Sequence, residues 1–127
     1  MKLDELNYVD EAEHVINVLK SGDRNGRLSL TTSKIRNLLS MTAELYTAAQ
    51  QQRGETLSAE IQGRVQYLRM RVAYEAGRDM TVKIFVEKAE LLELLKDIQS
   101  DRKKLLLFCR YMEALIAYHR YCGGLDK

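Results

Sequence analysis

Residues 61–76 read IQGRVQYLRMRVAYEA, and the spacing of the apolar side chains in this stretch decides its fold. These side chains follow one another at steps of three and four residues: Ile61, Val65, Leu68, Val72 and Ala76. Steps of that length return to one side of an α-helix, whereas a half-buried strand would alternate. The stretch predicts an amphipathic helix that is capped by Ser58 and ends near Gly77.

The same periodicity continues on both sides of this stretch. Apolar residues recur at helical steps in four further segments, near residues 7–20, 32–52, 81–98 and 101–121. Candidate caps precede three of these segments: Asn7, Thr31 or Thr32, and Ser100 or Asp101. The 127 residues include no proline, the residue that breaks helix interiors, and no repeat or linker. The sequence predicts an all-α fold, a compact bundle of about five helices that forms a single domain over residues 1–127.

The segment 81–98 is apolar on two sides. One side carries Val82, Phe85, Val86, Ala89 and Leu92, and another carries Leu91, Leu94, Leu95 and Ile98. A helix of this kind is either central in its own fold or contacts a second protein. On the second interpretation, Leu91 and Leu94 are expected to face a neighbouring subunit.

The bulk composition excludes several classes of protein. A net charge of +2, from 20 basic and 18 acidic residues, is too balanced to indicate nucleic-acid binding by itself. No stretch approaches the roughly 18 apolar residues of a membrane span, and the first ten residues lack the apolar run of a signal peptide. Cys109 and Cys122 have no metal-site spacing, so we expect reduced thiols in a cytoplasmic protein that does not contact membranes.

Positive charge is sorted onto particular helices. Residues 58–78 contain four arginines and two glutamates, and five residues of this segment recur at steps of three and four: Arg64, Tyr67, Arg71, Tyr74 and Arg78. They form a stripe about 115° around the helix from its apolar side. Arginine pairs with phosphate oxygens and tyrosine stacks on bases, so the stripe is suited to follow a nucleic-acid backbone. The alternative is a solvated face in which Arg71 pairs with Glu75.

Two weaker basic signals lie elsewhere. Lys34 and Arg36 stand where the helix near residues 32–52 begins, and together with free backbone amides they could hold a phosphate. In the last segment, Lys104, Tyr111 and Tyr118 recur at steps of seven, a pattern for which we favour packing at the edge of the core.

No catalytic constellation emerges from the sequence. His119 falls on the apolar side of the last segment, which is typical of a structural histidine, and His14 lies among acidic residues. The chain has no HExxH metal motif, no phosphate-binding glycine loop and no GxSxG nucleophile turn. We therefore expect no enzyme activity, no metal site and no cofactor.

Three stretches together resemble a known family. They are residues 30–38, LTTSKIRNL; residues 67–85, which begin YLRMRVAYEAGR and end VKIF; and residues 111–119, YMEALIAYH, followed by Gly123 and Gly124. In their order and spacing they are similar to the Csm small-subunit family of type III-A CRISPR effector complexes. The resemblance implies a non-catalytic helical bundle, several copies of which stack beside the backbone subunits and the large polymerase-like subunit.

The resemblance also implies an RNA site. The basic faces of such subunits line the channel that holds the duplex of guide RNA and target RNA and so support antiviral interference. Carried onto this sequence, the RNA-binding positions fall on Lys34, Arg36, Arg71 and Arg78, and also on Arg64, Arg69 and Lys83. The contacts are expected to be independent of sequence, because guide–target base pairing supplies the specificity. A helical adaptor that binds only proteins is the alternative.

Overall fold

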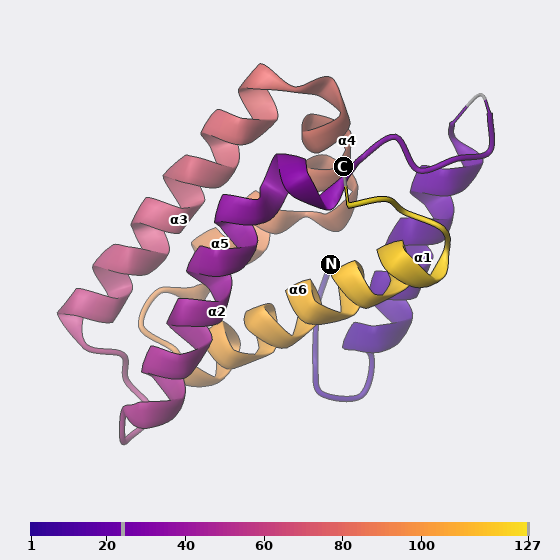
Figure 1. Ribbon diagram of the computed structural model, residues 1–127. Helices are drawn as coiled ribbons and strands as arrows, with labels where there is room; N and C mark the ends of the chain where they lie inside the picture. The colour runs from indigo at the N-terminus through magenta and orange to yellow at the C-terminus, as the bar shows by residue number, and fades with distance from the viewer. Residues whose placement is uncertain (24, 127) are drawn as a thin grey trace.

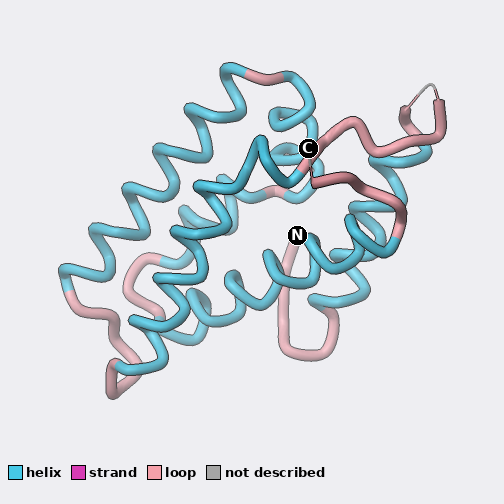
Figure 2. The backbone as a smooth tube through the Cα atoms, viewed as in Figure 1, coloured by secondary structure: helices cyan, strands magenta, loops and turns pink. Residues whose placement is uncertain are grey.

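The computed structural model describes residues 1–23 and 25–126, and within them it confirms the all-α fold. Helix is the dominant element and loops connect the helices (Figure 2). The elements in order are α1 Tyr8–Ser21, the 3-10 helix η1 Thr32–Ile35, α2 Arg36–Gln51, α3 Ala59–Arg78, α4 Met80–Ala89, α5 Leu91–Ile98 and α6 Arg102–Tyr121.

Helix α6 runs through the middle of the bundle. It contacts α1, α2 and α5, while α3 contacts α2, α4 and α5 (Figure 1). The side chains of α6 that face inward include Leu105, Phe108, Tyr111 and Leu115, all of which are buried. Burial of such side chains is the main favourable contribution to folding. Because α6 separates α1 from α2 and α3, the outer side of α3 lies at one edge of the molecule.

Two of the predicted helix caps are made by the expected side chains. The Ser58 hydroxyl accepts a hydrogen bond from the Ile61 amide at 3.2 Å, and the Asp101 carboxylate accepts one from the Lys104 amide at 3.2 Å. Asn7 stands at the N-cap position of α1, but its side chain makes no capping bond. Its Oδ1 accepts from the Asp4 amide instead, at 2.8 Å, so Asn7 closes a turn that precedes the helix.

The segment predicted as one helix over residues 81–98 is two helices, which raises the number of α-helices from about five to six. Glu90 separates them in a left-handed conformation, with φ of 56° and ψ of 40°. On one continuous helix, the apolar side of residues 82–89 and the apolar side of residues 91–98 would point about 180° apart. The break at Glu90 changes the direction of the chain before α5, so the apolar sides of α4 and α5 both face the same core.

The break also corrects the expectation of a subunit contact through Leu91. Leu91, Leu95 and Ile98 are buried in the monomer's own core, while Leu94 is only partly buried. Of the two interpretations of this apolar segment, the central one is therefore right for Leu91. A charged side chain at Leu91 would disrupt the fold before it could report on any neighbouring subunit.

No helix among the described residues is both long enough and apolar enough to span a membrane.

Candidate nucleic-acid interface

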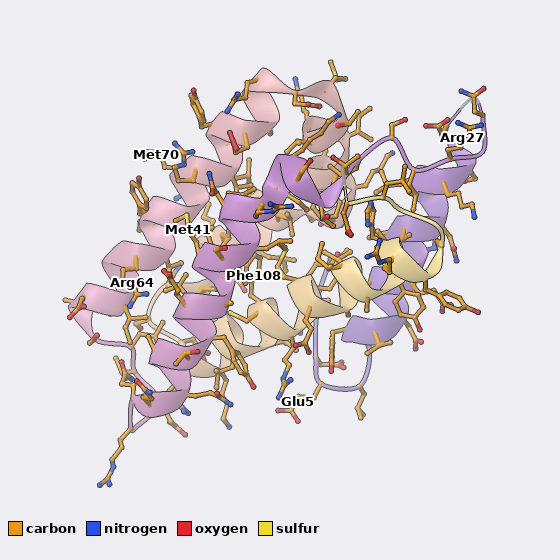
Figure 3. All side chains as sticks on the ribbon, viewed as in Figure 1. Glu5, Arg27, Met41, Arg64, Met70 and Phe108 are labelled. Atoms are coloured by element: carbon orange, nitrogen blue, oxygen red, sulfur yellow. The ribbon has the colours of Figure 1, made fainter. Side chains whose placement is uncertain are left out.

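The predicted row of arginine and tyrosine lies along α3, and we call it the α3 stripe: Arg64, Tyr67, Arg71, Tyr74 and Arg78. Tyr67 is 55% exposed and Tyr74 is 56% exposed, although both are large aromatic residues. Arg78 is also exposed, whereas Arg64 and Arg71 are half-buried. Figure 3 places Arg64 and Met70 on α3, across the molecule from Arg27 in the loop that follows α1. The stripe therefore lies on a different side of the molecule from the basic loop that contains Arg27.

Tyr74 organises the two arginines on either side of it. The guanidinium carbon of Arg71 lies 4.9 Å from the centroid of the Tyr74 ring, and that of Arg78 lies 5.7 Å away. Both distances fall within the range of about 6 Å in which a cation is attracted to an aromatic face. Arg78 additionally donates to the Glu75 carboxylate at 3.1 Å, so Glu75 pairs with Arg78 and not with Arg71. The alternative Arg71–Glu75 pair is therefore not formed.

A second basic surface lies where the start of α2 meets the junction of α3 and α4, and we call it the basic groove. Its lining residues come from both regions: Ser33, Lys34, Arg36, Asn37, Glu75, Arg78, Asp79 and Val82. Three of the predicted RNA-binding residues, Lys34, Arg36 and Arg78, thus converge on one hollow. Arg78 belongs to both surfaces, so the groove and the α3 stripe are continuous.

Two carboxylates inside the groove pair with two of its three cations, Asp79 with Lys34 and Glu75 with Arg78. The Lys34 ammonium lies 3.4 Å from Asp79 Oδ2 and donates to the Thr81 hydroxyl at 3.2 Å. Hydrogen bonds from Thr81, and secondarily the charge of Lys34, lower the pKa of the Asp79 carboxyl below its usual range. Asp79 therefore stays ionised at neutral pH. With three cations against two carboxylates, the groove keeps an excess of positive charge for an anionic ligand.

The remaining predicted residues lie apart from the groove. Arg69 is half-buried about 180° around α3 from the stripe, and it donates to Gln66 at 3.2 Å beside Leu92. Lys83 is exposed on α4, one residue beyond the groove-lining Val82. The structure thus brings Lys34, Arg36 and Arg78 together, aligns Arg64 and Arg71 with Arg78, and separates Arg69 from all of them.

Comparison with known proteins identifies the family. A family model described as Csm2 Type III-A matches residues 9–124. The protein named "CRISPR system Cms protein Csm2" from Streptococcus thermophilus is 47% identical over 120 residues, which cover 94% of each chain. A protein of the same name from Mycobacterium tuberculosis is 48% identical over the same share of both chains, and one from Enterococcus italicus is 38% identical over 94 residues.

The chain belongs to the Csm2 family of type III-A CRISPR systems.

The Csm2 family match spans every element that forms the two basic surfaces. All seven predicted RNA-binding residues lie within it, as do His119 and the glycines that follow α6. The resemblance to the Csm small-subunit family is therefore confirmed. This makes the chain a member of a small-subunit family of a CRISPR complex that contains other subunits.

Sequence reasoning missed several polar residues that complete the groove of this Csm2-family chain. Ser33 and Asn37 line it beside the cations, and Asp79 anchors Lys34 from the α3–α4 junction. In the sequence, Ser33 and Asn37 are recognisable only as polar residues near the start of α2. Nothing in the sequence indicated that this start lies against residue 79, because that contact depends on how the helices pack.

The two histidines lie in different surroundings. His119 is only 1% exposed and its Nε2 lies 2.7 Å from the carbonyl oxygen of Leu30, whereas His14 is exposed on α1. Over residues 1–23 and 25–126, no three His, Cys, Asp or Glu side chains are placed to share a metal ion.

Proposed function

We propose that this Csm2-family chain is a non-catalytic, RNA-binding small subunit of a type III-A CRISPR ribonucleoprotein. The basic groove and the α3 stripe line the channel that holds the guide RNA–target RNA duplex. The chain acts in the cytoplasm beside the backbone subunits, the large polymerase-like subunit and further copies of itself. It supports antiviral interference by holding the duplex while neighbouring subunits carry out the chemistry.

The observation that carries this proposal is the convergence of Lys34, Arg36 and Arg78. They come from segments far apart in the sequence, and Arg78 continues their surface into the α3 stripe. Arg71 and Arg78 stand about 10 Å apart along the helix axis, which allows each to meet a different phosphate of one strand. Phosphate contacts carry no base information, as a subunit that serves any guide requires.

The absence of catalysis in this proposal rests on the state of the titratable side chains. His119, the one buried histidine among the described residues, is held against a backbone carbonyl, and the nearest carboxylates of the groove are engaged by Lys34 and Arg78. The Nδ1 of His119 has no hydrogen-bond partner, but it is buried, so it has no access to a substrate from which a general base would take a proton.

A salt titration of RNA affinity tests the proposal. We expect Arg71→Ala with Arg78→Ala to weaken binding equally for RNAs of unrelated sequence and to lower the logarithmic salt slope by roughly one to two units, about 0.7–0.9 per lost contact. Lys34→Ala with Arg36→Ala should behave alike. The control is Arg53→Ala with Lys96→Ala, which removes the same charge from exposed positions outside both surfaces. Equal slopes for all variants would refute RNA binding at these surfaces.

A specific observation also favours the adaptor alternative. An apolar hollow opens between α2 and α6, lined by residues that include Leu39, Tyr46, Met112 and Ile116. Arg110 stands at its edge, with its guanidinium carbon 4.9 Å from the Tyr46 ring centroid. A subunit that only docks proteins would use this hollow and show no salt-dependent RNA binding. Full retention of complex assembly together with no RNA affinity would select the adaptor.

A further inference from the structure

The residues that follow α6 return to the start of η1, and we call residues Gly123–Asp126 the closing strap. The amide of Thr32 donates to the carbonyl of Leu125 at 3.1 Å, and the amide of Ser33 donates to the carbonyl of Asp126 at 2.9 Å. Figure 1 shows the yellow segment that follows α6 beside the segment that leads into α2. The strap is therefore paired with the residues directly before Lys34.

The Asp126 side chain reinforces this pairing. One carboxylate oxygen accepts from the Thr32 hydroxyl at 3.2 Å, and the other accepts from the Arg120 guanidinium at 2.8 Å. These two hydrogen bonds, Arg120 first, lower the pKa of the Asp126 carboxyl, to which the charge of Arg36 also contributes. Asp126 thus ties α6 to η1 on the side where Arg36 enters the basic groove.

The strap begins on a close contact with His119. The amide of Gly124 donates to the carbonyl of His119 at 2.7 Å, and a Cβ atom on Gly124 would lie 2.2 Å from the imidazole Cε1. Only glycine fits there. The same imidazole donates from Nε2 to the carbonyl of Leu30, so one buried ring supports both the strap and the segment it pairs with.

The strap carbonyls are the protein partners of the first amides of η1. Thr31 is the N-cap residue, but its side chain makes no capping bond, and the first amides of a helix have no partner within the helix. The strap carbonyls take the place of a cap. Without the strap carbonyls, the amides of Thr32 and Ser33 would lose their protein partners, and Lys34 and Arg36 would be held less firmly in the groove.

We propose that the closing strap is a positioning element for the basic groove, so that RNA affinity depends on residues 123–126 although they place no positive charge in the groove. The inference rests on the proposed function of that groove. It assigns a role to His119, Gly123 and Gly124, which make no contact with phosphate in the proposed function. His119, Gly124 and Asp126 are positioning residues that act through Lys34 and Arg36.

Asp126→Ala is a sharp test, because the strap inference and simple charge predict opposite changes in RNA affinity. Removing a carboxylate makes the protein more positive, which by itself strengthens RNA binding. If the strap positions the groove, Asp126→Ala should instead weaken binding by roughly fivefold or more, because the carboxylate accepts two hydrogen bonds and the net loss of one corresponds to about that factor. Asp97→Ala is the matched control, because Asp97 is an exposed carboxylate that pairs with Lys104 at 3.1 Å outside the groove. The control should bind RNA equally well or slightly better.

Two further variants separate positioning from charge and from general stability. Asp126→Asn removes the same charge but keeps an oxygen that can accept from Thr32, so it should recover much of the affinity that Asp126→Ala loses. Gly124→Ala should weaken binding more than Asp126→Ala, because its side chain must displace the His119 ring. If Gly124→Ala does not fold, the Asp126 pair still decides the question.

A double-mutant cycle closes the test. In a Lys34→Ala, Arg36→Ala background, Asp126→Ala should no longer weaken RNA binding, because the residues it positions are gone; RNA affinity should stay equal or rise slightly with the lost negative charge. Tighter binding by Asp126→Ala in the otherwise wild-type protein, or an equal loss in both backgrounds, would overturn the strap inference alone. If the Lys34→Ala, Arg36→Ala variant itself binds RNA like wild type, the proposed function of the groove fails, and the strap inference fails with it.

Discussion

Helices α3 and α6 have the same length, and both carry tyrosines among basic residues, yet Tyr111 of α6 and the two tyrosines of α3 lie in opposite surroundings. On α3, Tyr67 and Tyr74 lie on the outer side and more than half of each is exposed. On α6, Tyr111 is fully buried and its hydroxyl donates to the carbonyl of Ala89 at 3.0 Å. The angle between a tyrosine and the apolar side of its helix decides which outcome occurs, and residue type alone does not.

The largest expected effect is the loss of stability when a side chain on the inner side of α6 is removed. Tyr111→Ala removes a fully buried ring and leaves the Ala89 carbonyl without its partner, so the free energy of unfolding should fall by about 3–5 kcal/mol. Tyr67→Ala on α3 is the comparison and should change stability by less than about 0.5 kcal/mol. Urea denaturation of both variants measures the difference. Similar losses for both would mean that Tyr67 packs as tightly as Tyr111.

Thiol chemistry probes the same inner side. Burial raises the pKa of Cys109 from 9.0 to about 12, so its thiolate is about a thousandfold scarcer at pH 8 than that of an ordinary thiol. A thiol reagent should label the half-buried Cys122 first and Cys109 only on unfolding. An unfolded thiol ionises near pH 9 and the folded one near pH 12, so the native state loses stability as the pH rises through this window. Rapid labelling of both thiols in the native protein would contradict the burial of Cys109.

The loops that lead into the two helices should respond to glycine in opposite directions. The loop before α3 has a positive φ of 88° at Gly54, whereas the turn before α6 has a positive φ of 50° at Gln99. Gln99→Gly should therefore raise the free energy of unfolding by about 1 kcal/mol, and Gly54→Ala should lower it by a similar amount. Thermal or urea denaturation measures both. A destabilised Gln99→Gly variant would show that its side chain contributes more than the backbone strain costs.

The smallest expected effect concerns the outer side of α3. Tyr74→Leu removes the aromatic face that Arg71 and Arg78 share, and it should weaken RNA binding about threefold, the equivalent of roughly 0.5–1 kcal/mol. Tyr74→Phe keeps the face and should bind RNA like wild type. The two variants differ little in size, so a filter-binding comparison isolates the ring. If Tyr74→Leu also binds normally, the arginines do not need this ring to hold their positions.

Local patterns were enough to predict much of this structure. The Ser58 and Asp101 caps follow from residue type at a helix start, and the exposure of Tyr67 and Tyr74 follows from spacing within one helix. Tyr111 was expected at the edge of the core but is fully buried within it. The break at Glu90 did not follow, because no glycine or proline marks it and only the need to bury both Phe85 and Leu91 in one core imposes it. The angular position of Arg69, opposite the stripe, could have been read from the same helical geometry that defined the stripe.

The candidate site was less predictable than the helices. Only the three cations of the basic groove were predicted: Arg78 from the stripe on α3, and Lys34 and Arg36 from their place at a helix start together with the family resemblance. That these two face Arg78 and Asp79 depends on the packing of the start of α2 against the α3–α4 junction. A single sequence holds no direct signal for such a contact.

The closing strap has a consequence for how the protein is made. Its hydrogen bonds join Thr32 to Asp126 across 94 residues of chain, whereas the contacts inside each helix span only four. During synthesis the helices can form as they leave the ribosome, but the start of α2 meets its partner only after residue 126 has been added. Since α3 and α4 must also be in place, the groove takes shape only after residues 32–126 have all been added.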